Sequence, residues 1–352
     1  MFKSPLKTWL HPKSALLATL EHTFPQFPAL HLLIGARKGS ENTFPRWTEL
    51  LADSLGVSSW MDSRDSLTKI EGKIPPVMEH FLHFSQRENF PLWKIHVSEG
   101  LTVCMVDVSA LSGSLGESWT QISEAFDVCL FEINGANSAD QCPVGAHCFA
   151  SFEPISMKSN SVPTLIFADD LIQNCELFFL GIKQLLAQDP NKEKQWIYLF
   201  RPRSSSILQV KEILLESCID RFAMLSAASG VLPIPGVDVA LDLAILQKMH
   251  SFIMISMDLE VMDAESSVAS SGKSQRWMAA GQKLSTVMVK QFVGSFLKNR
   301  LGAAASSKLL KVVPVVGNVA AASAGYFFTK WLGKQMLKEF KVLVEKRFRQ
   351  EF

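Results

Sequence analysis

The turn after the first predicted strand carries the residue types of a phosphate-binding loop. Residues 35–40, with the sequence GARKGS, lie between an apolar run and a predicted helix. Such a loop holds phosphate with backbone N–H groups, a lysine on the terminal phosphates and a hydroxyl on Mg²⁺. The usual pattern is G-x-x-x-x-G-K-[ST], whereas here the glycines are one residue closer and the lysine precedes the second glycine. The candidate residues are Gly35, Lys38, Gly39 and Ser40, and an ordinary strand-to-helix loop is the alternative.

Two aspartates follow later predicted strands and could complete such a site. Asp107 follows the apolar run 101–106, where a D-x-x-G segment would place a carboxylate near Mg²⁺, but Ala110 occupies the glycine position. Asp169 follows the run 164–168, where a guanine-reading motif would place its aspartate, but the Asn or Thr and the Lys of that motif are missing. The order of these candidates, each at a strand end, is more specific than any one of them.

Other kinds of chemistry find little support. The sequence contains no G-x-S-x-G, H-E-x-x-H or protein-kinase motif. His80 and His83 form the one close histidine pair, without a surrounding cysteine or carboxylate framework, so we expect no metal site. The six cysteines lack a C-x-x-C pair, and no apolar signal segment follows Met1, which predicts reduced thiols inside the cell.

Residues 28–205 alternate short apolar runs with longer amphipathic stretches. Strands that are apolar on both faces, separated by helices, indicate a parallel or mixed sheet covered by helices. The expected strands are residues 29–34, 101–106, 126–133, 164–168 and 196–200, and the expected helices are 47–52 and 177–186. Residues 57–95 give no clear pattern, and residues 134–163 indicate an irregular loop or a poorly formed helix.

After residue 205 only helical periodicity remains. The expected helices are residues 207–222, 238–262, 275–301 and 320–348. Two apolar Pro-x-x-Gly segments, within 232–237 and 313–318, precede two of these helices and predict two αα-hairpins with hydrophobic corners. The uncharged run 312–329 is barely long enough to span a membrane, and its Pro, Gly and Ala content favours a buried hairpin.

Charge is distributed unevenly along the 352 residues. The formal net charge is +1, but residues 1–200 sum to −7, residues 201–265 to −4 and residues 266–352 to +12. A hydrophobic content of 47% excludes wholesale disorder. A basic rear joined to an acidic front suggests nucleic acid, an anionic membrane or an acidic partner.

Eight cations form stripes on the last two predicted helices, each within an arc of roughly 80° at 100° per residue. They are Arg276, Lys283, Lys290 and Lys298 on one helix and Lys330, Lys334, Lys338 and Lys341 on the other. No RNA-binding box or helix-turn-helix accompanies them, so an anionic membrane is a better target than nucleic acid. The alternative is that the stripes pack toward the acidic front domain of the chain.

Residues 232–249, with the sequence LPIPGVDVALDLAILQKM, resemble the start of the helical domain of immunity-related GTPases, the interferon-inducible family. Residues 313–332 resemble that family's second apolar corner and the helix after it, and residues 126–133 resemble the strand before its base-reading segment. The resemblance is specific over about 205–349 and more general over 28–205. It implies a Ras-like, P-loop NTPase-type α/β domain at 28–205 and a helical domain at 206–352, after an N-terminal helical segment at 1–27.

The resemblance further implies GTP or GDP with Mg²⁺ as ligand, association with related GTPases, and cell-autonomous innate immunity at the cytoplasmic surface of internal membranes. Gly35, Lys38, Gly39 and Ser40 map onto the phosphate loop with a deletion and a changed order, while Asp107 and Asp169 map onto the magnesium-side and guanine-reading aspartates. The lost lysine position and glycine spacing remove main sources of phosphate affinity and of rate. We therefore expect a pseudo-GTPase, the alternatives being an active GTPase of that family or an interaction module without a nucleotide cycle.

Overall fold

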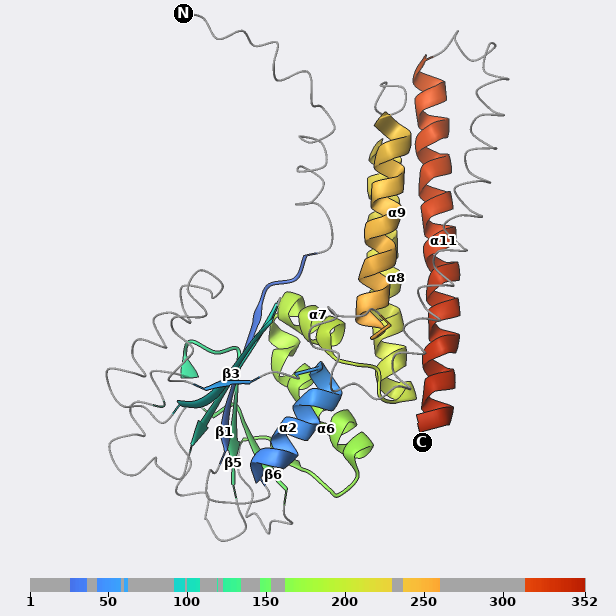
Figure 1. Ribbon diagram of the computed structural model, residues 1–352. Coiled ribbons are helices and arrows are strands. Elements are labelled where there is room, and N and C mark those ends of the chain that lie inside the picture. The colour runs from blue at the N-terminus through green and yellow to red at the C-terminus, as the bar shows by residue number, and fades with distance from the viewer. Residues whose placement is uncertain are drawn as a thin grey trace, which may run out of the picture. The chain divides into compact units, whose positions relative to one another are not determined.

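The computed structural model describes residues 26–36, 43–57, 60–62, 92–98, 100–107, 119, 123–133, 146–152, 162–229, 237–259 and 314–351 (Figure 1). The chain forms two compact units, one of residues 27–208 and one that contains the described residues from 209 onward. The division falls inside the long helix α8 (Ser205–Ser229), three residues beyond the boundary drawn from the sequence at 205. Each unit is described by itself.

The first unit is built on a sheet with the strand order β2-β3-β4-β1-β5-β6-β7. Its strands are β1 (Leu30–Ala36), β2 (Met61–Asp62), β3 (Leu92–Ser98), β4 (Leu101–Asp107), β5 (Val128–Glu132), β6 (Cys148–Ser151) and β7 (Thr164–Ile166). The strands β4, β1, β5, β6 and β7 run parallel, whereas β3 is antiparallel to β4 and β2 to β3. The expected mixed, mainly parallel sheet is therefore confirmed.

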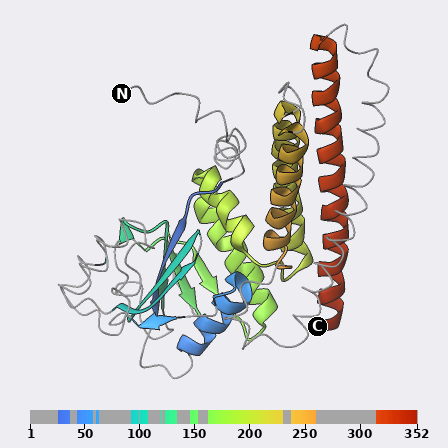
Figure 2. The same ribbon diagram turned by 45° about the horizontal axis from the view of Figure 1, so that its top comes forward.

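Burial explains why the central strands are almost continuously apolar. In β1 every residue except His31 and Gly35 is a fully buried hydrophobic residue, and the first six residues of β4 are all buried. Helices α2 (Thr43–Leu55), α6 (Leu171–Leu185) and α7 (Pro190–Leu199) lie together on one side of the sheet (Figures 1 and 2). Between α6 and α7 the chain makes a single 3₁₀ turn, η4 (Leu186–Gln188). A strand covered on both faces has no need of polar alternation.

Two local expectations for this unit were wrong, and one segment without an interpretation contains strands. Residues 196–200 are not a strand, because they belong to α7 and its C-terminal cap. The deciding signal is the Asp189-Pro190 pair: the Asp189 carboxylate caps the helix by accepting from the N–H groups of Asn191 and Lys192, and proline suits the first helical position. The segment 134–163 was expected to be irregular but contains β6, and the uninterpreted segment 57–95 contributes β2 and part of β3.

The second unit consists of α8, α9 (Val237–Ser256) and α11 (Pro314–Glu351) in its described part. An α/β unit followed by a helical one is the expected fold class at this level. Residues 313–318 do not form the second corner, since Pro314 begins α11 and the segment is its first turn, where proline fits. The other apolar corner, within 232–236, lies outside the described residues, as do residues 1–25 and the helix expected at 275–301. Within the described residues, no helix meets the length and hydropathy that crossing a membrane requires.

Helices α8 and α11 are antiparallel and approach closely at two glycines. A Cβ on Gly325 would lie 3.1 Å from the Ser226 carbonyl oxygen, and one on Gly333 would lie 2.6 Å from Ile219 Cγ2. From Gly325 to Gly333 the residue number on α11 rises, whereas that of the contacted residue on α8 falls from Ser226 to Ile219, so the two helices run in opposite directions. The two glycines therefore let the helix backbones come closer than larger side chains would allow.

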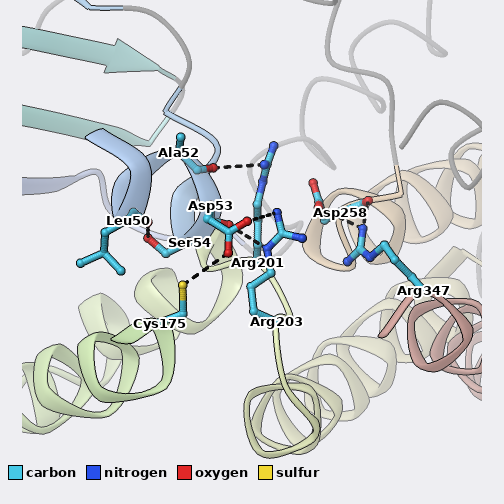
Figure 3. A network of polar contacts seen from close by, with 9 residues as sticks. All are labelled: Leu50, Ala52, Asp53, Ser54, Cys175, Arg201, Arg203, Asp258 and Arg347. Atoms are coloured by element: carbon cyan, nitrogen blue, oxygen red, sulfur yellow. Dashed lines mark hydrogen bonds and ion pairs between the residues drawn. The ribbon is translucent and has the colours of Figure 1, made fainter. Parts of the chain in front are cut away.

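A buried polar cluster joins the three helices of this unit. Lys211 of α8 is fully buried and donates to Ser256 Oγ of α9 at 3.0 Å. Arg347 of α11 donates to the Asp258 backbone carbonyl at 3.2 Å and forms an ion pair with its carboxylate at 3.1 Å (Figure 3). Asp258 has a φ of 57°, in the left-handed region that non-glycine residues rarely adopt. Hydrogen bonds thus hold a non-glycine residue in a strained conformation just after α9.

The buried Lys211 predicts that stability rises with pH just above neutrality. Burial lowers the pKa of Lys211 to about 7, although Asp258 acts in the opposite direction. Because the unfolded chain holds this proton up to its ordinary pKa near 10.5, unfolding binds a proton between these values, and the free energy of unfolding should increase by roughly 1–2 kcal/mol from pH 7 to 8.5. Urea unfolding of the native chain, of Lys211→Met and of the exposed control Lys338→Met measures this. Persistence of the pH dependence in Lys211→Met would contradict it.

Candidate functional site

The carboxyl end of β1 is the place where the sheet reverses its direction of growth. After β1 the chain adds β2, β3 and β4 on one side, and it then crosses to add β5, β6 and β7 on the other. In open α/β sheets, ligands bind outside the carboxyl ends of the strands at such a switch point. The topology therefore selects the same strand end that the phosphate-loop pattern selected.

Two of the candidate residues meet at this point. In the parallel pairing of β1 with β4, Gly35 is opposite Val106 and Ala36 is opposite Asp107. Asp107 is the half-buried last residue of β4. Lys38, Gly39 and Ser40 lie outside the described residues. The described part of the candidate site thus consists of a strand end with one adjacent carboxylate.

Asp169 lies apart from these residues. It follows β7, which β5 and β6 separate from β1, and its side chain is 97% exposed. Its carboxylate makes a 3.5 Å ion pair with Arg46 in the first turn of α2. The structure therefore brings Gly35 and Asp107 together but not Asp169.

A buried carboxylate that the sequence analysis missed ends β5. Glu132 is 2% exposed and accepts a hydrogen bond from Trp47 Nε1 of α2 at 3.3 Å. Trp47 is itself fully buried, with its ring centre 5.2 Å from that of Phe152 and 5.7 Å from that of Phe167. The available signal was an acid at the end of the apolar stretch 128–133, because a buried carboxylate needs a hydrogen-bond donor.

Arg46 and Trp47 fasten the start of α2 to the carboxyl ends of β6 and β7. The Arg46 guanidinium donates to the Phe152 carbonyl at 3.2 Å and lies 5.7 Å from the centre of the Phe152 ring. With Phe167, these side chains form an aromatic cluster over the ends of the last two strands. A ligand at the ends of these two strands would need an open crevice, and the side chains of the cluster occupy that place.

Acid–base groups of the sheet gather at the opposite edge. Asp127, just before β5, accepts from the His31 backbone N at 2.7 Å and forms a 2.6 Å ion pair with Lys192. Burial lowers the pKa of both His31 and His147, against the opposing effect of Asp127. These imidazoles are therefore neutral at pH 7, and they lie at the amino ends of the strands, away from Gly35.

The described cysteines are poor nucleophiles. Cys104, Cys129, Cys148, Cys175 and Cys218 are all buried free thiols. Burial raises the pKa of Cys129 and of Cys148 to about 12 and raises that of Cys104 and Cys175 as well. Since the thiolate is the reactive form, these residues do not support covalent catalysis at neutral pH. The described residues also contain no group of three or more His, Cys, Asp or Glu that could hold a metal ion.

The basic stripe of α11 packs largely against acidic residues of α8. Three of its four lysines make ion pairs, all within the helical unit: Lys330 with Asp220 at 2.7 Å, Lys334 with Glu216 at 3.8 Å and Lys341 with Glu212 at 2.7 Å. Lys338 is exposed and makes no ion pair with another described residue. The stripe at Arg276, Lys283, Lys290 and Lys298 falls outside the described residues. The acids that these three lysines meet belong to α8 of the same unit, whereas the alternative interpretation expected acids of the front domain.

No protein family, curated protein or solved structure matches this chain.

The Trp47–Glu132 contact predicts a measurable contribution to stability. Trp47→Phe keeps an aromatic ring but removes the donor to a buried carboxylate, which should lower the free energy of unfolding by about 1.5–3 kcal/mol. Glu132→Gln keeps an acceptor oxygen for Trp47 and should cost less. Urea unfolding followed by circular dichroism compares the two variants. Equal stability of Trp47→Phe and the native chain would show that the contact does not hold α2.

Proposed function

We propose that the chain is an immunity-related GTPase-like protein with a Ras-like α/β domain that acts as a pseudo-GTPase, with weak or no GTP hydrolysis. The observation that carries the proposal is the adjacency of Gly35 and Asp107 at the switch point of a mainly parallel sheet. Phosphate and Mg²⁺ would be held by such a strand end with a neighbouring carboxylate. A separate helical unit follows, as the family resemblance implies.

Two features favour a degenerate site over an active one. The phosphate-loop pattern is shortened and Lys38 is displaced within it. In addition, Trp47 and Phe167 occupy the ends of β6 and β7, and Asp169 follows β7, which β5 and β6 separate from β1. A guanine-reading aspartate has to act on the same ligand as the phosphate loop, and Asp169 instead makes a surface ion pair with Arg46.

Equilibrium binding of a fluorescent GTP analogue with Mg²⁺ tests this proposal. We expect no submicromolar binding and no phosphate release. Any weak, Mg²⁺-dependent binding should be lost in Asp107→Ala and kept in Asp169→Ala, because only Asp107 lies beside β1. Submicromolar binding with turnover would instead establish an active GTPase of the same family.

A second candidate function is a membrane- or partner-binding module in the helical unit, without a nucleotide cycle. On α11, Phe327 and Trp331 are 69% and 55% exposed, and Lys338 lies on the same face within an arc of roughly 40° at 100° per residue. Aromatic and basic side chains together are typical of helices that bind at a membrane interface. This face, rather than the paired lysines, is the part of the basic stripe available to an anionic membrane.

Liposome flotation separates membrane binding from internal packing. If the exposed face binds anionic vesicles, Lys338→Glu and Trp331→Ser should reduce flotation severalfold while leaving unfolding nearly unchanged. Lys341→Glu, placed opposite Glu212, should instead lower stability, by up to about 1 kcal/mol. Unchanged flotation of folded Lys338→Glu and Trp331→Ser would remove the membrane role of this face.

A further inference from the structure

The residues that connect α7 to α8 are fastened to the last turn of α2. Arg203 forms a 2.8 Å ion pair with the Asp53 carboxylate and donates from Nε to the Asp53 carbonyl at 2.9 Å. Arg201 donates from its backbone N to the Ser54 carbonyl at 2.6 Å and from Nη1 to the Ala52 carbonyl at 3.2 Å. Figure 3 shows both arginine side chains against the end of α2. Two cations thus satisfy carbonyl groups at the negative end of the helix dipole.

The backbone after α2 is shaped for this contact. Gly56 has a φ of +72° and donates to the Ala52 carbonyl at 3.0 Å, as in helices that end in a left-handed glycine. A Cβ at this position would lie 2.6 Å from Arg201 Nη2. The Arg201 guanidinium therefore lies in the space that a side chain at residue 56 would occupy.

Helix α6 joins the same cluster and also reaches α8. Cys175 of α6 donates from Sγ to Asp53 Oδ2 at 3.5 Å, so Asp53 receives donors from two separate segments. The next residue of α6, Glu176, accepts from Ser206 Oγ in the first turn of α8 at 2.5 Å. The start of α8 is thereby bound to the elements that hold the end of α2.

The opposite end of α2 lies at the carboxyl edge of the sheet. There Arg46 and Trp47 contact the ends of β5, β6 and β7, and Leu50 and Leu51 are buried along the middle of the helix. From Trp47 to Asp53 the helix rises by about 9 Å. A hydrogen-bonded helix of this length moves as one body when one of its ends is displaced.

We infer that α2 is a mechanical link between the carboxyl edge of the sheet and the start of α8. A change that displaces the first turn of α2 is transmitted through Asp53 to Arg201 and Arg203, and from there to the first turn of α8. The covalent continuity of α8 carries the change into the helical unit. The inference rests on the proposed function only for the identity of a ligand that would displace α2. Its test uses no ligand.

Hydrogen exchange of the full chain, read by mass spectrometry, tests the link from both ends. Arg46→Ala removes side-chain contacts at the edge from a residue that is 40% exposed, so the fold should persist. We expect amides of residues 201–208 to exchange about tenfold faster in this variant, and amides at the start of α2 to respond likewise to Arg203→Ala. In the double variant, Arg46→Ala should add less at residues 205–208 than it does in the native chain, because the Arg203 part of the link is already cut.

A matched control breaks an ion pair of the same unit that does not involve α2. Lys183→Ala removes the 2.9 Å pair of Lys183 with Glu193 and should leave residues 201–208 unaffected. If residues 201–208 exchange at the native rate in Arg46→Ala while the start of α2 responds, the inference is overturned. It is equally overturned if the effect of Arg46→Ala on residues 205–208 is undiminished in the Arg203→Ala background. Failure of GTP binding would leave it standing.

Discussion

A carboxylate at the end of a buried strand constrains its surroundings, and Glu132 is such a group. Charge that is removed from water has to be met by donors, and one of them is the Trp47 indole of α2. The donor brings the helix onto the carboxyl ends of the strands, where Phe152 and Phe167 pack against the same indole. The position of α2, the closed aromatic cluster and the attachment of the segment before α8 all follow from where this helix is held.

Charged side chains of the helical unit are likewise met by partners of opposite charge. The rear of the sequence is strongly basic, but three lysines of α11 face carboxylates of α8, and Arg347 pairs with Asp258. Part of the asymmetry along the chain is therefore neutralised locally. Lys338 of the stripe stays exposed, on a face of α11 that also carries Phe327 and Trp331.

Elements that follow from composition and hydrophobic periodicity could be predicted from the sequence. Features that depend on single contacts between side chains could not. The strands β1 and β4 were predictable because both of their faces are buried and their residues are apolar throughout. β6 was missed because it has only four residues in a Ser- and Gly-rich segment, which is too short to show the apolar pattern of a strand. Residues 196–200 look like a strand by composition, and only the cap at Asp189 shows that they continue a helix. At the site, Gly35 and Asp107 followed from strand ends, whereas the Trp47–Glu132 pair joins residues 85 apart, which no local pattern contains.

The two glycines of α11 determine which alignment of α8 and α11 is possible. The ion pairs distinguish only partly between registers: if α11 slid by four residues, Lys334 and Lys338 would take the places of Lys330 and Lys334, and only the third pair would be lost, because Glu345 would face Glu212. The same slide would put Thr329 and Leu337 in the places of Gly325 and Gly333, where an added Cβ would lie 3.1 Å from the Ser226 carbonyl oxygen and 2.6 Å from Ile219 Cγ2, so the helices would have to move apart. Electrostatic attraction brings the helices together, and the small residues add a steric preference for one register.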